Sequence, residues 1–363
     1  MPWSWLIFLV IVLLLLALDL GLHRKSHAVS MREALAWSGF WVALGLAFTA
    51  FIYLGYENQW LGLGKARDAV DGAPNDGSAA AVKYLTGYVI EKSLSVDNIF
   101  VIAMLFRYFA VPARYQHRVL FWGILGALAM RGAMIAVGVR LIEEFEWLLY
   151  AFGAFLLFAA VQMLWTGGKH GGDPGKNPVV RLARRFFPVA DEFHGPHFMV
   201  RAGTPEARET DSHAPDRAAE RAGAGTWMLT PLALALIMVE TTDLIFAVDS
   251  IPAIFAITTD PYLVFTSNVF AILGLRALYF ALAGLMDKFR YLNVSLAAVL
   301  ALVGAKMLAA DWIKEMLGKN YNFHLLGAIL LILAAGVAAS LLAGPKPEHA
   351  DVARRAREAG EET

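Results

Sequence analysis

Long apolar windows dominate the hydrophobic pattern of the chain. A helix needs about 20 mostly apolar residues to cross the hydrocarbon core of a bilayer. The windows that meet this requirement are residues 3–22, 35–57, 82–106, 118–139, 146–166, 228–257, 262–286, 292–310 and 324–343. The pattern therefore predicts an all-α polytopic membrane protein with about nine transmembrane helices. The first window has no basic residues before it and no small-residue cleavage site after it, so we interpret it as a retained span.

The Lys and Arg residues between these windows predict the orientation of the chain. With the N-terminus outside, the inner segments are 23–34, 107–117, 167–227, 287–291 and the C-terminal tail, and they hold most of the Lys and Arg. The outer segments are then 58–81, 140–145, 258–261 and 311–323. Long loops carry charge regardless of side, but the short loops agree among themselves. The positive-inside rule thus predicts that the N-terminus lies outside and the C-terminus in the cytoplasm.

The same windows define a domain organisation. We expect N-terminal spans one and two in 1–57, an outer loop in 58–81, a first repeat of spans three to five in 82–166, a cytoplasmic linker in 167–227, a second repeat of spans six to eight in 228–310, an outer loop and span nine in 311–343, and a cytoplasmic tail in 344–363. The 167–227 segment is rich in Gly, Pro and Arg. This composition predicts an inserted linker that buries no core.

Composition supports the membrane assignment and limits the chemistry. Of 363 residues, 58% are hydrophobic and 17% are charged, against about 45–50% and about 25% in soluble domains. Lys plus Arg equals Asp plus Glu at 31 each, so no bulk field favours a nucleic-acid partner. The sequence contains no Cys. Any metal site must therefore use oxygen or imidazole ligands.

Five carboxylates interrupt the third and sixth predicted spans. Glu91 and Asp97 lie in span three, and Glu240, Asp243 and Asp249 lie in span six. A charge at mid-helix costs about 2.5–3.5 kcal/mol on insertion scales, so five uncompensated charges would cost roughly 12–18 kcal/mol. That cost rivals the whole stability of a typical domain, about 5–15 kcal/mol. The carboxylates must therefore face one another, cations, water or a bound metal ion.

The two spans also resemble each other. The segment Asp97–Phe100 (DNIF) aligns with Asp243–Phe246 (DLIF) at an offset of 146 residues. The two spans run in opposite directions in the predicted topology. This is the pattern of an inverted repeat, here spans three to five against six to eight, and secondary transporters place their sites near the bilayer midplane where such repeats meet.

The residues of these spans define a candidate metal site. Glu240 and Asp243 are three residues apart and share a helix face. The intramembrane amide of Asn268 is as consistent with a bond between helices as with a ligand. The predicted ligands are Glu91, Asp97, Asn98, Glu240, Asp243, Asp249 and Asn268. These hard oxygen donors suit Mg²⁺, Ca²⁺ or Mn²⁺.

Basic residues in the spans offer a different role for the acids. Lys92, Arg131, Arg276 and Lys306 could pair with the carboxylates and only fix helix packing. For Arg131 and Arg276 we favour structural ion pairing, and Lys92 adjoins Glu91. Lys306 can extend to the outer surface. The acids still outnumber the bases, which leaves charge for an exchangeable cation or protons.

Three of these stretches resemble the signatures of a known family. Residues 91–98 (EKSLSVDN), 240–253 (ETTDLIFAVDSIPA) and 267–276 (SNVFAILGLR) are similar to signatures of the TerC family of integral membrane proteins, and 191–198 (DEFHGPHF) resembles its Alx-like branch. The resemblance implies a polytopic inner-membrane protein of the cation-exporting branch of the lysine-exporter superfamily. It associates the Alx-like branch with manganese export, and the family with an older label of tellurium resistance. It also implies that the five acids, Asn98 and Asn268 are signature positions.

These observations favour an inner-membrane divalent-cation exporter, for Mn²⁺ in particular, working by alternating access. H⁺ or Na⁺ would be the counter-ion, or export would be uncoupled. The expected partners are the divalent ion, the lipid bilayer and the counter-ion, with no nucleic acid and no permanently bound cofactor. We expect no enzymatic activity, because the sequence has no nucleophile–base pair, Gly-rich phosphate loop or HExxH. The alternative is a membrane scaffold for stress response, including tellurium resistance or redox control, that docks partners through its cytoplasmic linker. Export of amino acids remains open by superfamily analogy.

Overall fold

The computed structural model describes residues 2–22, 30–166, 177–208, 210–212, 216–282, 291–317 and 321–343. Its first half comprises α1 (Pro2–Leu22), α2 (Met31–Glu57), the 3₁₀ helix η1 (Trp60–Gly62), β1 (Arg67–Asp68), β2 (Ala73–Pro74), α3 (Gly77–Tyr108), α4 (Ala113–Glu144) and α5 (Leu148–Thr166). Its second half comprises α6 (Pro178–Phe186), β3 (Met199–Arg201), α7 (Pro205–Arg208), α8 (Arg217–Arg221), β4 (Trp227–Leu229), α9 (Pro231–Phe255), α10 (Pro261–Ile272), α11 (Leu275–Leu282), α12 (Leu292–Leu308), α13 (Ala310–Leu317) and α14 (Tyr321–Ala343).

Polar caps set where the helices around the site begin. The side chain of Asp76 accepts a hydrogen bond from the backbone N–H of Ala79 and caps α3. Thr230 caps α9 and Asp260 caps α10, each followed by a Pro in the first turn. Side-chain oxygens satisfy amides that have no partner inside the helix, and Pro lacks that amide altogether. These caps therefore set where α3 and α9, which carry most of the predicted ligands, begin.

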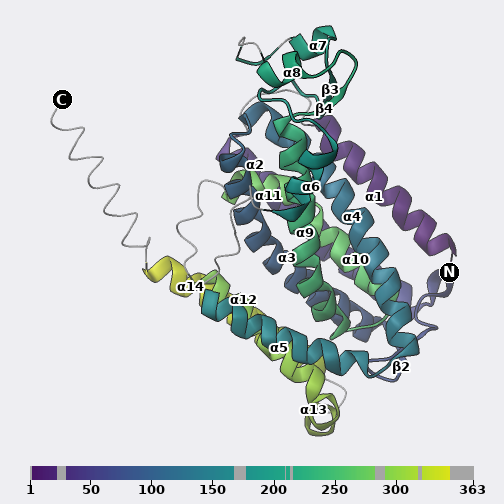
Figure 1. Ribbon diagram of the computed structural model, residues 1–363. Helices are drawn as coiled ribbons and strands as arrows, with labels where there is room; N and C mark the ends of the chain where they lie inside the picture. The colour runs from purple at the N-terminus through teal and green to yellow at the C-terminus, as the bar shows by residue number, and fades with distance from the viewer. Residues whose placement is uncertain are drawn as a thin grey trace.

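The membrane helices form two packed groups (Figure 1). The larger group holds α1 to α4 and α9 to α11, with α3 in contact with α2, α9 and α10. The smaller group holds α5, α12 and α14, and it crosses the larger one obliquely (Figure 1). Its apolar core reaches the larger group through Ile90 of α3 and Ala253 of α9. The centre of α3 therefore lies where the two groups meet.

Helix length and apolarity support membrane insertion. In the described part of the chain, α2, α4, α5, α9 and α14 are each long and apolar enough to cross a bilayer, and the bent pair α10–α11 makes up to a sixth span. The apolar helices α1 and α12 are shorter, and α3 carries several charged residues. The all-α polytopic fold is thus confirmed. The nine predicted windows all coincide with these helices, but nine crossings and the inverted repeat stay predictions.

A glycine creates the break between α10 and α11. The two helices are bent by 40°, and Gly274 between them has φ of +80°. A side chain at this backbone angle would be strained. In addition, a Cβ at Gly274 would lie 2.5 Å from the Cβ of Trp41. The break therefore brings α11 close against α2 and exposes the last carbonyls of α10 to new partners.

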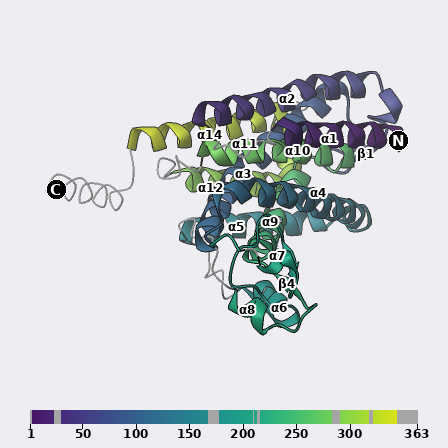
Figure 2. The ribbon, with the colours of Figure 1, turned by 90° about the horizontal axis from the view of Figure 1, so that it is seen from above.

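The segment between α5 and α9 is folded, so the expectation that it buries no core is wrong. Antiparallel strands β3 and β4 pair, α7 contacts β3, and alanines of α8 pack against the same core, whereas α6 packs against α9. Four small side chains and one methionine bury a core despite the composition: Ala190, Val200, Ala202, Ala207 and Met228. Seen from above, the segment projects from the bundle on the side opposite α2 (Figure 2). The predicted start of the linker at 167–176, the tail after 343 and most of the predicted inner loops 23–34 and 287–291 lie outside the described residues.

Candidate functional site

A buried arginine lies at the centre of the larger helix group. Arg131 of α4 donates from Nη2 to Asp243 Oδ1 over 3.0 Å and from Nε to Asp243 Oδ2 over 3.2 Å. Its Nη1 pairs with Glu91 Oε1. The exposed fractions are only 1% for Glu91, 3% for Arg131 and 6% for Asp243. The planar guanidinium thus binds one carboxylate of α9 with two bonds and reaches a carboxylate of α3 at the same time.

Two further polar side chains complete this cluster. Asn98 of α3 donates from Nδ2 to Asp243 Oδ1 over 3.0 Å. Ser250 of α9 accepts a bond of 3.3 Å from Arg131 Nη1. We call Glu91, Asn98, Arg131, Asp243 and Ser250 the arginine network. Its charged members lie near the middle of α3, α4 and α9. Gly87 of α3 lies beside Ile254 of α9, and Asn98 bonds to Asp243, so α3 and α9 run antiparallel.

Several acceptor oxygens near the arginine network have no hydrogen-bond partner. Among the described residues, Glu91 Oε2, Asn98 Oδ1 and Glu240 Oε2 are all buried without one. A buried, unsatisfied acceptor costs about 1–3 kcal/mol. These oxygens are the kind of donor that a hard cation prefers. The arginine network thus satisfies only part of its own oxygen set.

A glycine on α4 makes room for Glu240. The carboxylate of Glu240 lies against Gly126, and a Cβ at that position would overlap it. Glu240 is three residues from Asp243 on the same face of α9, and Gly126 is five residues from Arg131 on α4. The sequence analysis did not single out Gly126. The only signal in the sequence is a small residue in a span that must approach an acidic one.

The remaining predicted ligands lie elsewhere on their helices. Asp97 is buried on α3, and Asp249 is half-buried on α9 next to the exposed Val248. Asn268 is buried on α10, and its Nδ2 has no hydrogen-bond partner. In the described part of the chain, no group of three or more His, Asp or Glu side chains is placed to hold a metal ion. The structure thus brings together Glu91, Asn98 and Asp243, and it brings them to an arginine.

The other two predicted ion-pairing residues contact different partners. Lys92 donates from Nζ to the carbonyls of Ala271 over 3.0 Å and Leu273 over 3.3 Å, where α10 ends. Arg276 pairs with Asp19 of α1, with 3.0 Å between Nη2 and Oδ1. The sequence analysis did not pair Arg276 with Asp19, because nothing in the sequence places α1 beside α11. Lys92 acts as a donor to a broken helix rather than as a partner of Glu91.

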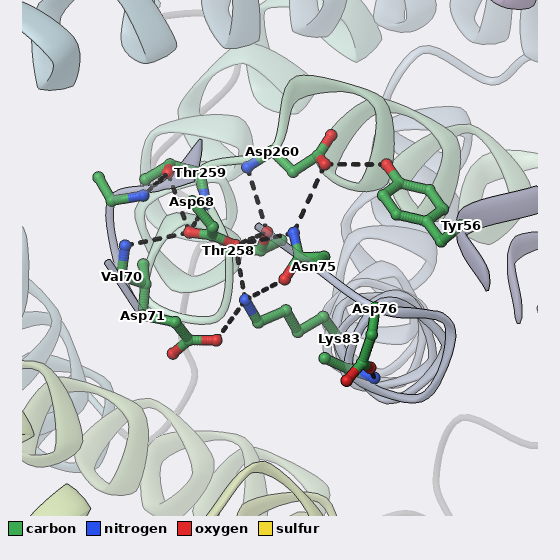
Figure 3. A network of polar contacts seen from close by, with 12 residues as sticks. Tyr56, Asp68, Val70, Asp71, Asn75, Asp76, Lys83, Thr258, Thr259 and Asp260 are labelled. Carbon is green, nitrogen blue, oxygen red and sulfur yellow. Dashed lines mark hydrogen bonds and ion pairs between the residues drawn. The ribbon is translucent and has the colours of Figure 1, made fainter. Parts of the chain in front are cut away.

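A second polar cluster lies at the end of the bundle where β1 and β2 form a hairpin (Figure 3). We call it the hairpin network: Tyr56, Asp68, Asp71, Asn75, Lys83, Thr258, Thr259, Asp260 and Tyr321. Lys83 of α3 is fully buried, with 2.7 Å from Nζ to Asp68 Oδ2 and 2.5 Å to Asp71 Oδ2. Thr258 donates to the same oxygen of Asp68 over 2.5 Å. These bonds tie the α2–α3 loop to the α9–α10 connection and close this end of the bundle.

The hairpin network shifts the titration of its central acid. Burial by itself raises the pKa of Asp68, but the charge of Lys83 and the hydrogen bonds from Lys83, Thr258 and Thr259 outweigh it and lower that pKa to about 2. Asp68 is therefore a permanent anion at physiological pH. Nothing in the sequence predicts this network, since its hydrogen-bonded partners are up to 250 residues apart and no motif joins them.

Comparison with known proteins identifies the family. The profile of the integral membrane protein TerC family matches residues 76–347, well over half of the chain. The chain belongs to the TerC family. The matched region contains the whole arginine network, whereas the hairpin strands lie before it. The expected resemblance to TerC at the three signature stretches is thus confirmed.

Relatives place this TerC protein in the Alx-like branch, as the resemblance implied. An uncharacterized membrane protein of Myxococcus xanthus is 43% identical over 350 residues, 96% of this chain and 94% of the relative. A protein of Escherichia coli (strain K12) with the provisional name membrane-bound redox modulator Alx is 45% identical over 313 residues, 86% of this chain and 87% of the relative. A membrane protein of Rickettsia bellii is 37% identical over 311 residues, 85% of this chain and 89% of the relative. No solved structure matches the chain.

Proposed function

We propose that this TerC protein exports divalent cations, Mn²⁺ in particular, across the inner membrane by alternating access. The observation that carries the proposal is the arginine network. It gathers carboxylate and amide oxygens from near the middle of two antiparallel helices, and Glu91 and Asn98 each retain an unpaired oxygen. Ionisable residues inside membrane spans are rare and commonly mark ion pathways.

The donor set fits a hard divalent ion. Glu91 and Asp243 supply carboxylates, Asn98 supplies an amide oxygen, and Glu240 lies one helical turn from Asp243. Mn²⁺ accepts such oxygen ligands, and it gives up its water more readily than Mg²⁺. The acids can release the ion by taking up protons, because neighbouring carboxylates oppose each other's ionisation. H⁺ is thus one counter-ion, and uncoupled export is the alternative. The protein needs no permanently bound cofactor, and transport requires no enzymatic step.

The surface of the folded 177–230 segment supports the proposed orientation. Helix α6 exposes Arg181, Arg184 and Arg185 together with the apolar side chains of Leu182 and Phe186. Basic residues next to exposed apolar ones are typical of the cytoplasmic membrane surface, which carries anionic lipids. We therefore propose that the 177–230 segment is cytoplasmic and that the hairpin network lies at the periplasmic end. The N-terminus is then periplasmic and the C-terminus cytoplasmic.

Transport into inverted membrane vesicles tests the proposal. Vesicles that carry the wild-type protein should accumulate Mn²⁺, with Ca²⁺, Mg²⁺ and Fe²⁺ compared under an imposed and a collapsed pH gradient. Asp243→Asn and Glu240→Gln should each lower uptake at least about tenfold, which corresponds to about 1.4 kcal/mol. Asp191→Asn, which changes an exposed carboxylate of the cytoplasmic segment, should leave uptake unchanged. If the wild-type protein moves none of these ions above the level of empty vesicles, the proposal is wrong.

A stress-response scaffold remains the second candidate. The folded segment between α5 and α9 favours it, because that segment offers a docking surface, and so does the provisional redox name of relatives. A redox role would not run through thiols of these 363 residues, which include no Cys. Replacing residues 178–229 by a Gly/Ser linker separates the two functions: a scaffold loses its activity in stressed cells, whereas an exporter keeps Mn²⁺ uptake in vesicles.

A further inference from the structure

We propose that Arg131 is a tethered cation that competes with the transported ion for Glu91 and Asp243. This inference rests on the proposed function and adds how the site selects its ion and how the ion-free protein returns. The guanidinium lies where a bound cation would have to lie, since it contacts acids of α3 and α9 at once. Arg131 stays charged under all physiological conditions.

The bonding pattern fits a replaceable partner better than a permanent lock. Arg131 binds both oxygens of Asp243 but only one of Glu91, and Asn98 Oδ1 beside it has no partner. A purely structural arginine would be expected to leave no buried acceptor unsatisfied, because each costs about 1–3 kcal/mol. A spherical ion can draw in Glu91 Oε2 and Asn98 Oδ1, which the flat guanidinium does not reach.

Charge determines which ions can displace Arg131. Two ionised carboxylates and one guanidinium have a net charge of −1. With a divalent ion in place of the guanidinium, the net charge is zero. A monovalent ion leaves the sum at −1 and gains nothing over Arg131. Arg131 also competes at a high effective concentration, because its own helix holds it at the site. Arg131 is therefore a specificity-determining residue that rejects Na⁺ and K⁺ and admits divalent ions.

The same residue eases the return of the ion-free protein. After the ion leaves, two bare carboxylates in a low-dielectric interior would oppose any rearrangement of α3 against α9. When Arg131 pairs with Glu91 and Asp243 again, it supplies the missing charge without a counter-ion from solution. Loss of Arg131 should thus slow net export, which needs the ion-free return, and spare exchange of one bound ion for another, which does not.

The test compares Arg131→Met, Arg131→Lys and Arg276→Met as purified full-length proteins. Calorimetry measures Mn²⁺ affinity with and without 100-fold excess Na⁺, and proteoliposomes measure Mn²⁺/Mn²⁺ exchange and net Mn²⁺ flux. Arg131→Met should bind Mn²⁺ at least about tenfold more tightly, or about 1.4 kcal/mol. Excess Na⁺ should lower the Mn²⁺ affinity of this variant. Its Mn²⁺/Mn²⁺ exchange should continue while its net Mn²⁺ flux falls. Arg131→Lys keeps the charge but not the two-bond geometry, so its affinity should lie between the two. Arg276→Met removes a buried arginine that pairs with Asp19 and should match the wild type.

The outcomes separate this inference from the function on which it rests. If the wild-type protein neither binds nor exchanges any divalent ion, the proposed function fails. If the wild-type protein exchanges Mn²⁺ and Arg131→Met binds it no more tightly and stays insensitive to Na⁺, the exporter stands and the tethered cation is refuted. If Arg131→Met does not fold, an unchanged Mn²⁺ affinity in Arg131→Lys refutes it equally.

Discussion

Replacing Asp68 by Asn tests how much the hairpin network stabilises the protein. The pKa of Asp68 falls from its ordinary value of 3.8 to about 2 in the folded protein. A pKa difference of this size corresponds to about 2–3 kcal/mol of folding free energy. Because the folded-state pKa is the lower one, this contribution is fully present above about pH 4 and is lost as pH falls through about 2. Asp68→Asn should remove it at neutral pH.

Thermal unfolding in detergent, followed by tryptophan fluorescence, measures this effect. Asp68→Asn should lower the unfolding midpoint at pH 7 by roughly 5–10 °C, on the scale of soluble domains of 150–250 residues. The difference from wild type should shrink toward zero between about pH 4 and pH 2. Asp191→Asn changes an exposed carboxylate instead and should shift neither the midpoint nor its pH dependence. A midpoint for Asp68→Asn within 1–2 °C of wild type at pH 7 would refute the argument that Lys83 and Asp68 stabilise this end of the bundle.

Two further substitutions examine the surroundings of the arginine network. Gly126→Ala places a methyl group in the space of the Glu240 carboxylate, so Mn²⁺ uptake in vesicles should fall about tenfold or more. Gly327→Ala is the control: no atom beyond its own stretch of helix lies within 4 Å of the new Cβ, and uptake should stay unchanged. Equal uptake by the two variants would contradict the placement of Glu240. Lys92→Met leaves two carbonyls at the end of α10 without their donor. The loss should cost about 1–3 kcal/mol of stability and lower the unfolding midpoint. An unaltered midpoint would show that this contact is dispensable.

Hydrophobic windows and charged interruptions predicted the broad features of the fold. Each apolar window longer than about 20 residues coincides with a helix, because the bilayer leaves the backbone no partner other than itself. The acids of spans three and six stood out for the same reason: a charge in an apolar window needs a partner. Glu91 and Asp243 do share one, and the identity of that partner as Arg131 was among the alternatives that the sequence left open.

The parts that sequence reasoning missed depend on contacts between distant segments. Thr258 and Asp68 are 190 residues apart, and neither belongs to a recognisable motif. The Gly- and Pro-rich composition of the 177–230 segment predicted that it buries no core. Ala and Val nevertheless bury a small core there, because strands β3 and β4 pair closely. Gly126 could not be recognised as a site residue without knowing that Glu240 faces it. Spacing along one helix is readable from sequence, whereas neighbours across helices are not.

The hairpin network has a consequence for how the protein is made. Asp68 and Lys83 are 15 residues apart and leave the ribosome almost together. Thr258 follows 190 residues after Asp68, and Tyr321 follows 250 residues after Asp71. At a synthesis rate of about 5–20 residues per second, Thr258 is made roughly 10–40 s after Asp68. During that interval the early ammonium and carboxylate have chiefly each other as partners. Closure of the network is thus among the last steps of assembly, and it can take place only once the second half of the chain has been inserted.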